Sequence, residues 1–169
     1  MSWLKVEVKG FSMVSLILIC VLLRIVWEGI MLLYFNPLGV TIIVSSRGTP
    51  LMVLIPYFLG TLLIRAVLEE WVFRLLPFAI CIGSYGRRSG RAIMAVSVVS
   101  SIIFGWVHGG PQFIPFEGVG GLIYCIVFIK CGGFQERYAK ATACSTVTHY
   151  SFNLFVIVLS CLLKGKGNL

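Results

Sequence analysis

Long apolar runs, interrupted by short polar or glycine-containing breaks, make up most of this 169-residue chain. Several runs approach or exceed the ~20 residues that an α-helix needs to cross a bilayer. We therefore expect apolar helices over five ranges, which are 11–35, 50–82, 92–108, 116–129 and 141–163. The pattern predicts an all-α, polytopic transmembrane helix bundle of about 5–6 spans.

Proline and glycine mark the breaks between these helices. The pair Asn36-Pro37 favours a turn after the first helix, and the Gly-Gly-Pro sequence at 109–111 stops the third. The apolar stretch 40–44 is too short to cross a ~30 Å hydrocarbon core, so we expect an interfacial piece there. The second helix would be about 50 Å long if it were straight, and Pro77 is expected to kink or break it. The glycines within 116–129 would let that helix pack closely against a neighbour.

The composition agrees with a membrane protein rather than a soluble one. Apolar residues make up 59% of the chain and charged residues 12%, with a mean hydropathy of +0.99. No shift in composition sets one part of the chain apart from the rest. We therefore expect a single membrane domain over residues 1–169, surrounded by lipid.

The net charge of +8 is concentrated in short clusters between the apolar runs. Two basic loops, 83–91 and 130–140, fall on the same side as the N-terminal lysines if the chain has five spans. The positive-inside rule then places the N-terminus in the cytoplasm. Because the basic residues form no long stripe, we expect no nucleic-acid partner.

The first apolar run resembles a signal peptide at its start, because Lys5 and Lys9 precede it. No small-x-small cleavage site follows. Arg24 and Glu28 interrupt the run at a spacing that would let them form an ion pair on one helix face. We interpret the run as a retained transmembrane helix.

The six cysteines are expected to be small core residues, because most of them lie inside apolar runs. They show neither a Cys-x-x-Cys motif nor the Cys/His spacing of zinc sites.

Two adjacent glutamates, Glu69 and Glu70, lie near the end of the longest apolar element, and Arg74 follows one turn later. Ionisable groups inside a bilayer are costly and usually functional. Glu70 and Arg74 share a helix face, so we expect them to pair, to hold the helix and to set the local field. Glu69 points roughly 100° away from Glu70 and would be free for another role.

The chain contains two histidines, His108 and His149, and both lie in apolar helices. Asn153 is one helical turn beyond His149 and projects from the same face. Measured from the basic loops at ~1.5 Å per residue, Glu69 lies about 20 Å, His108 about 25 Å and His149 about 14 Å from the inner surface. Three helices would therefore bring these side chains to a similar depth, as a single buried polar site requires.

Such a set of side chains suits the activation of water. Burial disfavours the charged form of Glu69, so this carboxylate could take a proton from a water molecule. His108 could position or share that water. His149 and Asn153 could donate hydrogen bonds to a developing oxyanion.

Three motifs occur in a fixed order on apolar helices. Glu69-Glu70-x-x-x-Arg74 is followed by Phe104-x-x-x-His108 and then by His149-x-x-x-Asn153. Together they resemble the CPBP family of CAAX prenyl proteases, bacteriocin-processing and Abi-type immunity proteins, and related glutamic intramembrane endopeptidases. The resemblance covers about residues 50–160, and we place the motif-bearing core at about 50–163.

The resemblance implies a membrane-buried polar cavity in which a peptide bond of a membrane-associated protein or peptide is hydrolysed without a cofactor. By motif position, Glu69 would be the general base and His108 its partner at the water. His149 and Asn153 would be the oxyanion donors. The supporting residues would be Glu70, Arg74 and Phe104.

The chain is shorter than the prenyl-processing members of that family and closer in size to compact bacterial and archaeal members. This favours the cytoplasmic (inner) membrane of a prokaryote. The candidate substrates are prenylated CAAX-like proteins, C-terminal sorting signals, and bacteriocin or other peptide precursors.

Other interpretations of the same residues stay open. Glu69, His108 and His149 could form a two-histidine, one-carboxylate zinc shell, although the chain has no His-Glu-x-x-His motif. A non-catalytic immunity or peptide-binding protein could use the same cavity. A transporter would need polar residues along a path through both membrane faces, whereas these converge at one depth.

We also make predictions for three side chains near the motifs. Arg65 lies one turn before Glu69 and could pair with it, which would oppose a role for Glu69 as a base. Ser145 is four residues before His149 and is a weak candidate nucleophile. Glu117 is expected to be solvated or interfacial.

Overall fold

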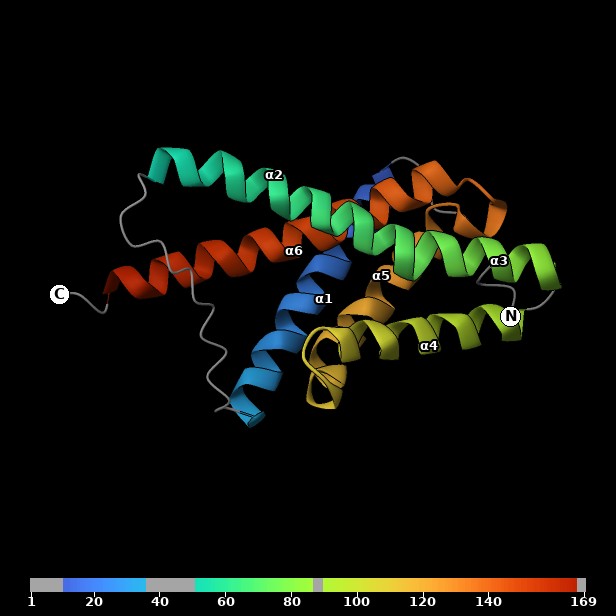
Figure 1. The fold of residues 1–169 in the computed structure, drawn as a ribbon, viewed down its shortest axis with the longest axis horizontal. Helices are drawn as coiled ribbons and strands as arrows, with labels where there is room; N and C mark the ends of the chain where they lie inside the picture. Colours follow the sequence, from blue (N-terminus) through green and yellow to red (C-terminus); the bar gives the residue numbers. More distant parts are fainter. Residues whose placement is uncertain (1–10, 36–50, 87–89, 167–169) are drawn as a thin grey trace.

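The computed structural model describes residues 11–35, 51–86 and 90–166, and these are helical almost throughout (Figure 1). The α-helices are α1 (Phe11–Phe35), α2 (Leu51–Glu70), α3 (Leu76–Tyr85), α4 (Gly90–Val107), α5 (Val119–Lys130) and α6 (Tyr138–Lys166). Short π and 3-10 turns join them, namely η2 (Trp71–Leu75), η3 (Pro111–Phe113), η4 (Ile114–Gly118) and η5 (Gly133–Gln135).

One long rod and one long helix form the frame of the bundle. Elements α2, η2 and α3 follow one another without a gap, and α6 runs back alongside α2 (Figure 1). Helix α4 returns beside α3, α5 packs against both α4 and α6, and α1 crosses α6. The expected all-α membrane bundle is thereby confirmed.

The helix was expected to kink or break at Pro77, but it continues through the proline, with a π-helical turn, η2, that ends two residues before it. Proline has no backbone N–H, so the carbonyl of Phe73, four residues earlier, lacks its usual helical donor. The hydroxyl of Ser100 on α4 donates a hydrogen bond to this carbonyl instead. The rod therefore continues through Pro77 because a neighbouring helix satisfies the exposed backbone group.

A close backbone approach joins α4 to η4. A Cβ on Gly105 would lie 2.7 Å from Ile114 Cα and 2.8 Å from Gly118 N. The chain reverses just beyond α4 through Gly109 and Gly110, whose φ angles are +152° and +94°. Glycine adopts such angles without strain, which explains why the Gly-Gly-Pro sequence ends α4 here.

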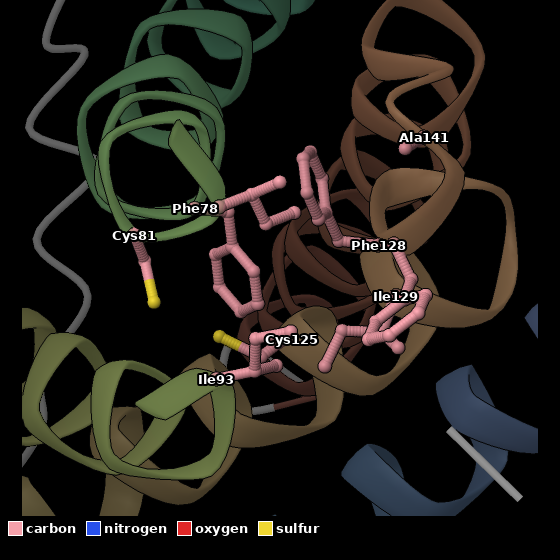
Figure 2. Packing of buried hydrophobic residues seen from close by; sticks show 9 residues of the cluster. Phe78, Cys81, Ile93, Cys125, Phe128, Ile129 and Ala141 are labelled. Atoms are coloured by element: carbon pink, nitrogen blue, oxygen red, sulfur yellow. The ribbon is translucent and has the colours of Figure 1, made fainter. Parts of the chain in front are cut away.

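The largest apolar core lies between α3, α4, α5 and the start of α6 (Figure 2). The rings of Phe78 and Phe128 are 5.2 Å apart at its centre. Cys81 and Cys125 are fully packed within the same cluster. The expectation of cysteines as small core residues holds for the five whose side chains are described, since all five are buried and free.

Four helical segments in the described part of the chain are long and apolar enough to cross a membrane. They are Ser12–Met31, Gly90–Val107, Pro111–Lys130 and Tyr138–Leu159. The first helix agrees with its predicted range, whereas α4 and α6 begin two and three residues earlier than expected. The turn predicted at Asn36-Pro37 and the interfacial piece at 40–44 lie outside the described residues.

We predict that Gly105→Ala destabilises the protein, because the added methyl group would clash with the backbone of η4. Overpacking of this kind costs about 1–3 kcal/mol. Gly83→Ala is the matched control, since a Cβ there meets nothing within 4 Å. Thermal unfolding in detergent should show a lower midpoint for Gly105→Ala alone, and equal midpoints for both variants would contradict the close approach.

Candidate active site

Glu69, His108 and His149 meet at one carboxylate oxygen. The Nε2 atom of His149 lies 3.5 Å, and that of His108 3.8 Å, from Glu69 Oε2. Glu69 comes from the end of α2, His108 from the turn after α4 and His149 from the middle of α6. The side chains of Glu69 and His108 are 19% and 22% exposed, whereas His149 is only 3% exposed. The predicted convergence of these three residues is thus present, on the rim of a buried cluster.

Glu70 occupies the interior beneath this point and is fully buried. Its Oε1 lies 3.2 Å from Arg74 Nη1 and 3.0 Å from His149 Nδ1. Its Oε2 lies within hydrogen-bonding distance of the Ser145 hydroxyl. The predicted Glu70–Arg74 pair is therefore present, and the two adjacent glutamates contact opposite nitrogens of one imidazole ring.

The Arg74 guanidinium packs against an aromatic ring and a glycine. Its guanidinium carbon lies 4.3 Å from the centroid of the Phe104 ring, and its Nη2 donates to the carbonyl of Gly121 at 3.3 Å. A Cβ on Gly121 would stand 3.2 Å from Arg74 Nη2 and equally close to the Phe104 ring. The missing side chain of Gly121 thus makes room for a buried cation and for the aromatic residue of the second motif.

The hydrogen bonds of His108 define which nitrogen carries its proton. Its Nδ1 lies 2.7 Å from the carbonyl oxygen of Phe104, and a carbonyl can only accept a hydrogen bond. Nδ1 therefore donates, and in the neutral ring the lone pair is on Nε2, which faces Glu69. Phe104 contributes both this carbonyl and a ring 4.3 Å from the imidazole centroid.

Two residues of the site, Tyr124 and Ser145, were not assigned their roles from the sequence. The Tyr124 ring stacks on His149 at 4.5 Å with an interplanar angle of 19°. Ser145 Oγ lies near Glu70 Oε2 and 3.1 Å from the Tyr124 carbonyl oxygen. Its single proton can serve one of these acceptors at a time. The i−4 spacing of Ser145 from His149 was the available signal, and it was interpreted only as a weak sign of a nucleophile, whereas the structure shows a contact with Glu70.

The remaining predicted site residues have simpler surroundings. Asn153 follows His149 by one turn of α6 and is partly buried. Arg65 is 72% exposed, and its Nη2 lies 3.5 Å from Glu69 Oε1, so the expected pair forms at the surface of the protein. Within the ranges that the structure describes, no group of three or more His, Cys, Asp or Glu side chains is arranged to hold a metal ion. The zinc hypothesis stays a prediction for experiment.

A second charged cluster joins α1 to η4. Arg24 is fully buried and lies 2.9 Å from both Glu28 Oε2 and Glu117 Oε2, through Nη1 and Nη2 respectively. The predicted Arg24–Glu28 pair is confirmed. Glu117, which was expected to be solvated or interfacial, is 28% exposed, and its pair with a cation 93 residues away in the chain was not foreseen.

Comparison with known proteins gives two matches. Residues 51–155 match the model of the Rce1-like family, described as type II CAAX prenyl endopeptidase Rce1-like. The chain is also 26% identical over 121 residues to the membrane-embedded CAAX protease MroQ of Staphylococcus aureus. That alignment covers 72% of this chain and 44% of the relative, so the chain spans less than half of the relative's length. No solved structure gave a significant match.

We predict that Arg74→Met destabilises the protein strongly, because it leaves the buried Glu70 carboxylate without its cation. Breaking a buried pair in this way costs about 3–5 kcal/mol. Arg65→Met is the matched control, because its pair is largely exposed and such pairs contribute about 1 kcal/mol or less. Thermal unfolding in detergent should show a far lower midpoint for Arg74→Met than for Arg65→Met. Similar midpoints for the two variants would argue against a buried ion pair.

Proposed function

Because the chain belongs to the Rce1-like family of type II CAAX prenyl endopeptidases, we propose that it is an intramembrane endopeptidase of glutamic type. Glu69 would activate a water molecule that hydrolyses a peptide bond of a membrane-associated protein or peptide. The observation that carries this proposal is the convergence of two imidazole Nε2 atoms on Glu69 Oε2, at 3.5 and 3.8 Å.

The proposed water molecule has two acceptors in reach. Glu69 Oε2 accepts one of its hydrogens, and the lone pair on His108 Nε2 accepts the other. The Phe104 carbonyl holds His108 in the tautomer that this arrangement needs. Both hydrogens of the water are then engaged, which leaves an oxygen lone pair directed at the substrate carbonyl.

His149 and Asn153 are the proposed oxyanion donors. With Glu70 ionised beside Arg74, His149 Nδ1 donates to Glu70 Oε1. A ring that also donates through Nε2 is an imidazolium, and its positive charge would favour a developing oxyanion. Stacking on Tyr124 and burial fix the plane of this ring. Asn153 would add the second donor from the next turn of α6.

The proposed reaction balances within the site. Glu69 takes a proton from water while the water oxygen bonds to the scissile carbonyl carbon, which gives a tetrahedral oxyanion. The C–N bond then breaks, and the proton held by Glu69 passes to the leaving nitrogen. The products are a carboxylic acid and an amine, and the enzyme returns to its starting state.

The surroundings of the site favour a substrate that arrives from the membrane. Glu69 is partly exposed on a rod whose neighbouring side chains Leu68, Trp71 and Val72 are each 54% exposed. Such a surface suits lipid contact. We therefore propose prenylated CAAX-like proteins, C-terminal sorting signals and bacteriocin or other peptide precursors as the substrate classes to test. The relative from Staphylococcus aureus carries the name of a CAAX protease.

We predict that Glu69→Gln abolishes processing while the protein still folds, because the amide cannot accept the proton of water. General base catalysis contributes about 100-fold or more. The wild type, Glu69→Gln and His149→Ala would be co-expressed with candidate substrates of each class, and the substrate mass followed by intact mass spectrometry. Glu136→Gln is the control for the same chemical change, because Glu136 is exposed in the turn before α6.

A truncation that appears with the wild type and the control alone would support the proposal and identify the scissile bond. If Glu69→Gln cleaves as the wild type does, the glutamate mechanism is wrong. If a partner co-purifies with all variants and none shortens it, the site binds a peptide without hydrolysing it.

We further predict that cleavage by the purified protein persists after incubation with EDTA or 1,10-phenanthroline, because Glu69 acts as a base rather than as a metal ligand. Cleavage would be measured before and after removal of the chelator, with and without added Zn²⁺. Loss of activity that Zn²⁺ restores would support the two-histidine, one-carboxylate zinc site instead.

A further inference from the structure

Helix α1 lies outside the range matched by the family model, yet one of its charged residues reaches the centre of the bundle. Only 11% of the apolar segment of α1 is buried inside the protein. The buried side chains described in α1 are Cys20, Arg24 and Met31, which lie on one stripe. Arg24 is fully buried, so its charge must be used inside the protein.

The guanidinium of Arg24 holds the turn η4. Its Nη1 donates to the carbonyl of Phe116 at 2.7 Å, and its Nη2 donates to Glu117 Oε2 at 2.9 Å. One turn further along α1, Trp27 Nε1 donates to the carbonyl of Pro115 at 2.7 Å. Three consecutive residues of η4 are therefore fixed from α1.

Element η4 packs against α4, the helix that ends just before His108. Ile114 and Gly118 contact Gly105, and a Cβ on Gly118 would lie 3.1 Å from the carbonyl oxygen of Ser101. These contacts lie on the last turns of α4, beside Phe104, whose carbonyl holds the tautomer of His108. The position of η4 therefore affects the position of the end of α4, which His108 follows directly.

Arg24 also reaches the helix that carries His149 and Asn153. Its guanidinium carbon lies 4.4 Å from the ring centroid of Phe152, the residue between them in the motif. Gly120 of α5 lies against the same guanidinium, because a Cβ there would stand 2.5 Å from Arg24 Nε, and Tyr124 follows one turn later. The Tyr124 ring stacks on His149. The Arg24 guanidinium therefore contacts η4, which packs against α4, and also Phe152 on α6.

We propose that Arg24 is a positioning residue for hydrolysis, and that α1 completes the active site because Arg24 fixes η4 against α4 and contacts Phe152 on α6. The proposal rests on the proposed function. Arg24 does not touch the reacting atoms, so its loss should lower kcat by misplacing His108 and His149 rather than raise KM. A misplacement of this kind can cost about 100-fold.

The two carboxylates of the cluster separate positioning from simple charge neutralisation. Glu28 is on α1 itself, so its pair with Arg24 lies within one helix. Glu117 belongs to η4, so its pair joins two elements. If Arg24 only needed a counter-charge, the two glutamates would be equivalent. If it positions η4, Glu117 matters and Glu28 does not.

The test compares Arg24→Met, Arg24→Lys, Glu117→Gln and Glu28→Gln with the wild type and Glu69→Gln. The probes are internally quenched peptides with and without an S-farnesyl cysteine, and kinetics use the probe that the wild type cleaves fastest. Folding of each variant is checked by thermal unfolding in detergent, and a variant counts as folded if its unfolding midpoint lies well above the assay temperature.

We expect Arg24→Met and Glu117→Gln to lower kcat by about 10- to 100-fold with KM nearly unchanged. Glu28→Gln should retain the kcat of the wild type, and Arg24→Lys should recover part of it because a lysine can still pair with Glu117. If Arg24→Met fails to fold, Glu117→Gln decides the question.

A folded Glu117→Gln variant with the kcat of the wild type, or an equal loss for Glu28→Gln, overturns the positioning role. The failure of the proposed function has a different signature. In that case the wild type cleaves no probe, or Glu69→Gln cleaves as fast as the wild type.

Discussion

Every charge that this protein buries must be neutralised and hydrogen-bonded inside the bundle, since lipid can do neither. Two arginines, Arg24 and Arg74, meet this constraint in the same way. Each is fully buried, pairs with a glutamate four residues away in the sequence, and lies over an aromatic ring at 4.4 or 4.3 Å. Each also donates to a backbone carbonyl of η4 or α5.

Helix α5 makes both arrangements possible. A Cβ on Gly120 would lie 2.5 Å from Arg24 Nε, and one on Gly121 would lie 3.2 Å from Arg74 Nη2. Two successive glycines thus open room for two cations on neighbouring faces of one helix. The Tyr124 ring, one turn later, lies 5.3 Å from the Arg74 guanidinium carbon and stacks on His149. The sequence predicted α5 only as a closely packed helix, and in the structure both charged clusters contact it.

The sequence predicted the spans and the local pairs because these depend on periodicity alone. Hydropathy located α1, α4 and α6, and the four-residue spacing predicted the pair of Glu70 with Arg74. The convergence of Glu69 with the two histidines followed from counting depth along each helix.

The contacts that escaped prediction are those between distant elements. Nothing in the local pattern links Glu117 to Arg24, 93 residues earlier, or brings Ser145 onto Glu70, 75 residues earlier. Such contacts depend on how helices pack, which one sequence does not reveal. Pro77 did indicate an irregularity, but the π turn and the hydroxyl of Ser100 that completes it depend on α4.

That π turn sets the rotational phase of the whole rod. Ala66, Glu70, Arg74 and Phe78 are all fully buried although they are spaced four residues apart. In a continuous α-helix the residues at 66 and 78 would be rotated by about 120°, which would turn Phe78 away from the core. A π turn absorbs one extra residue, which reduces the rotation to roughly 20°. The charged end and the apolar end of the rod can therefore face the same interior. Seen this way, a single inserted residue lets one helix serve both the polar site and the hydrophobic core.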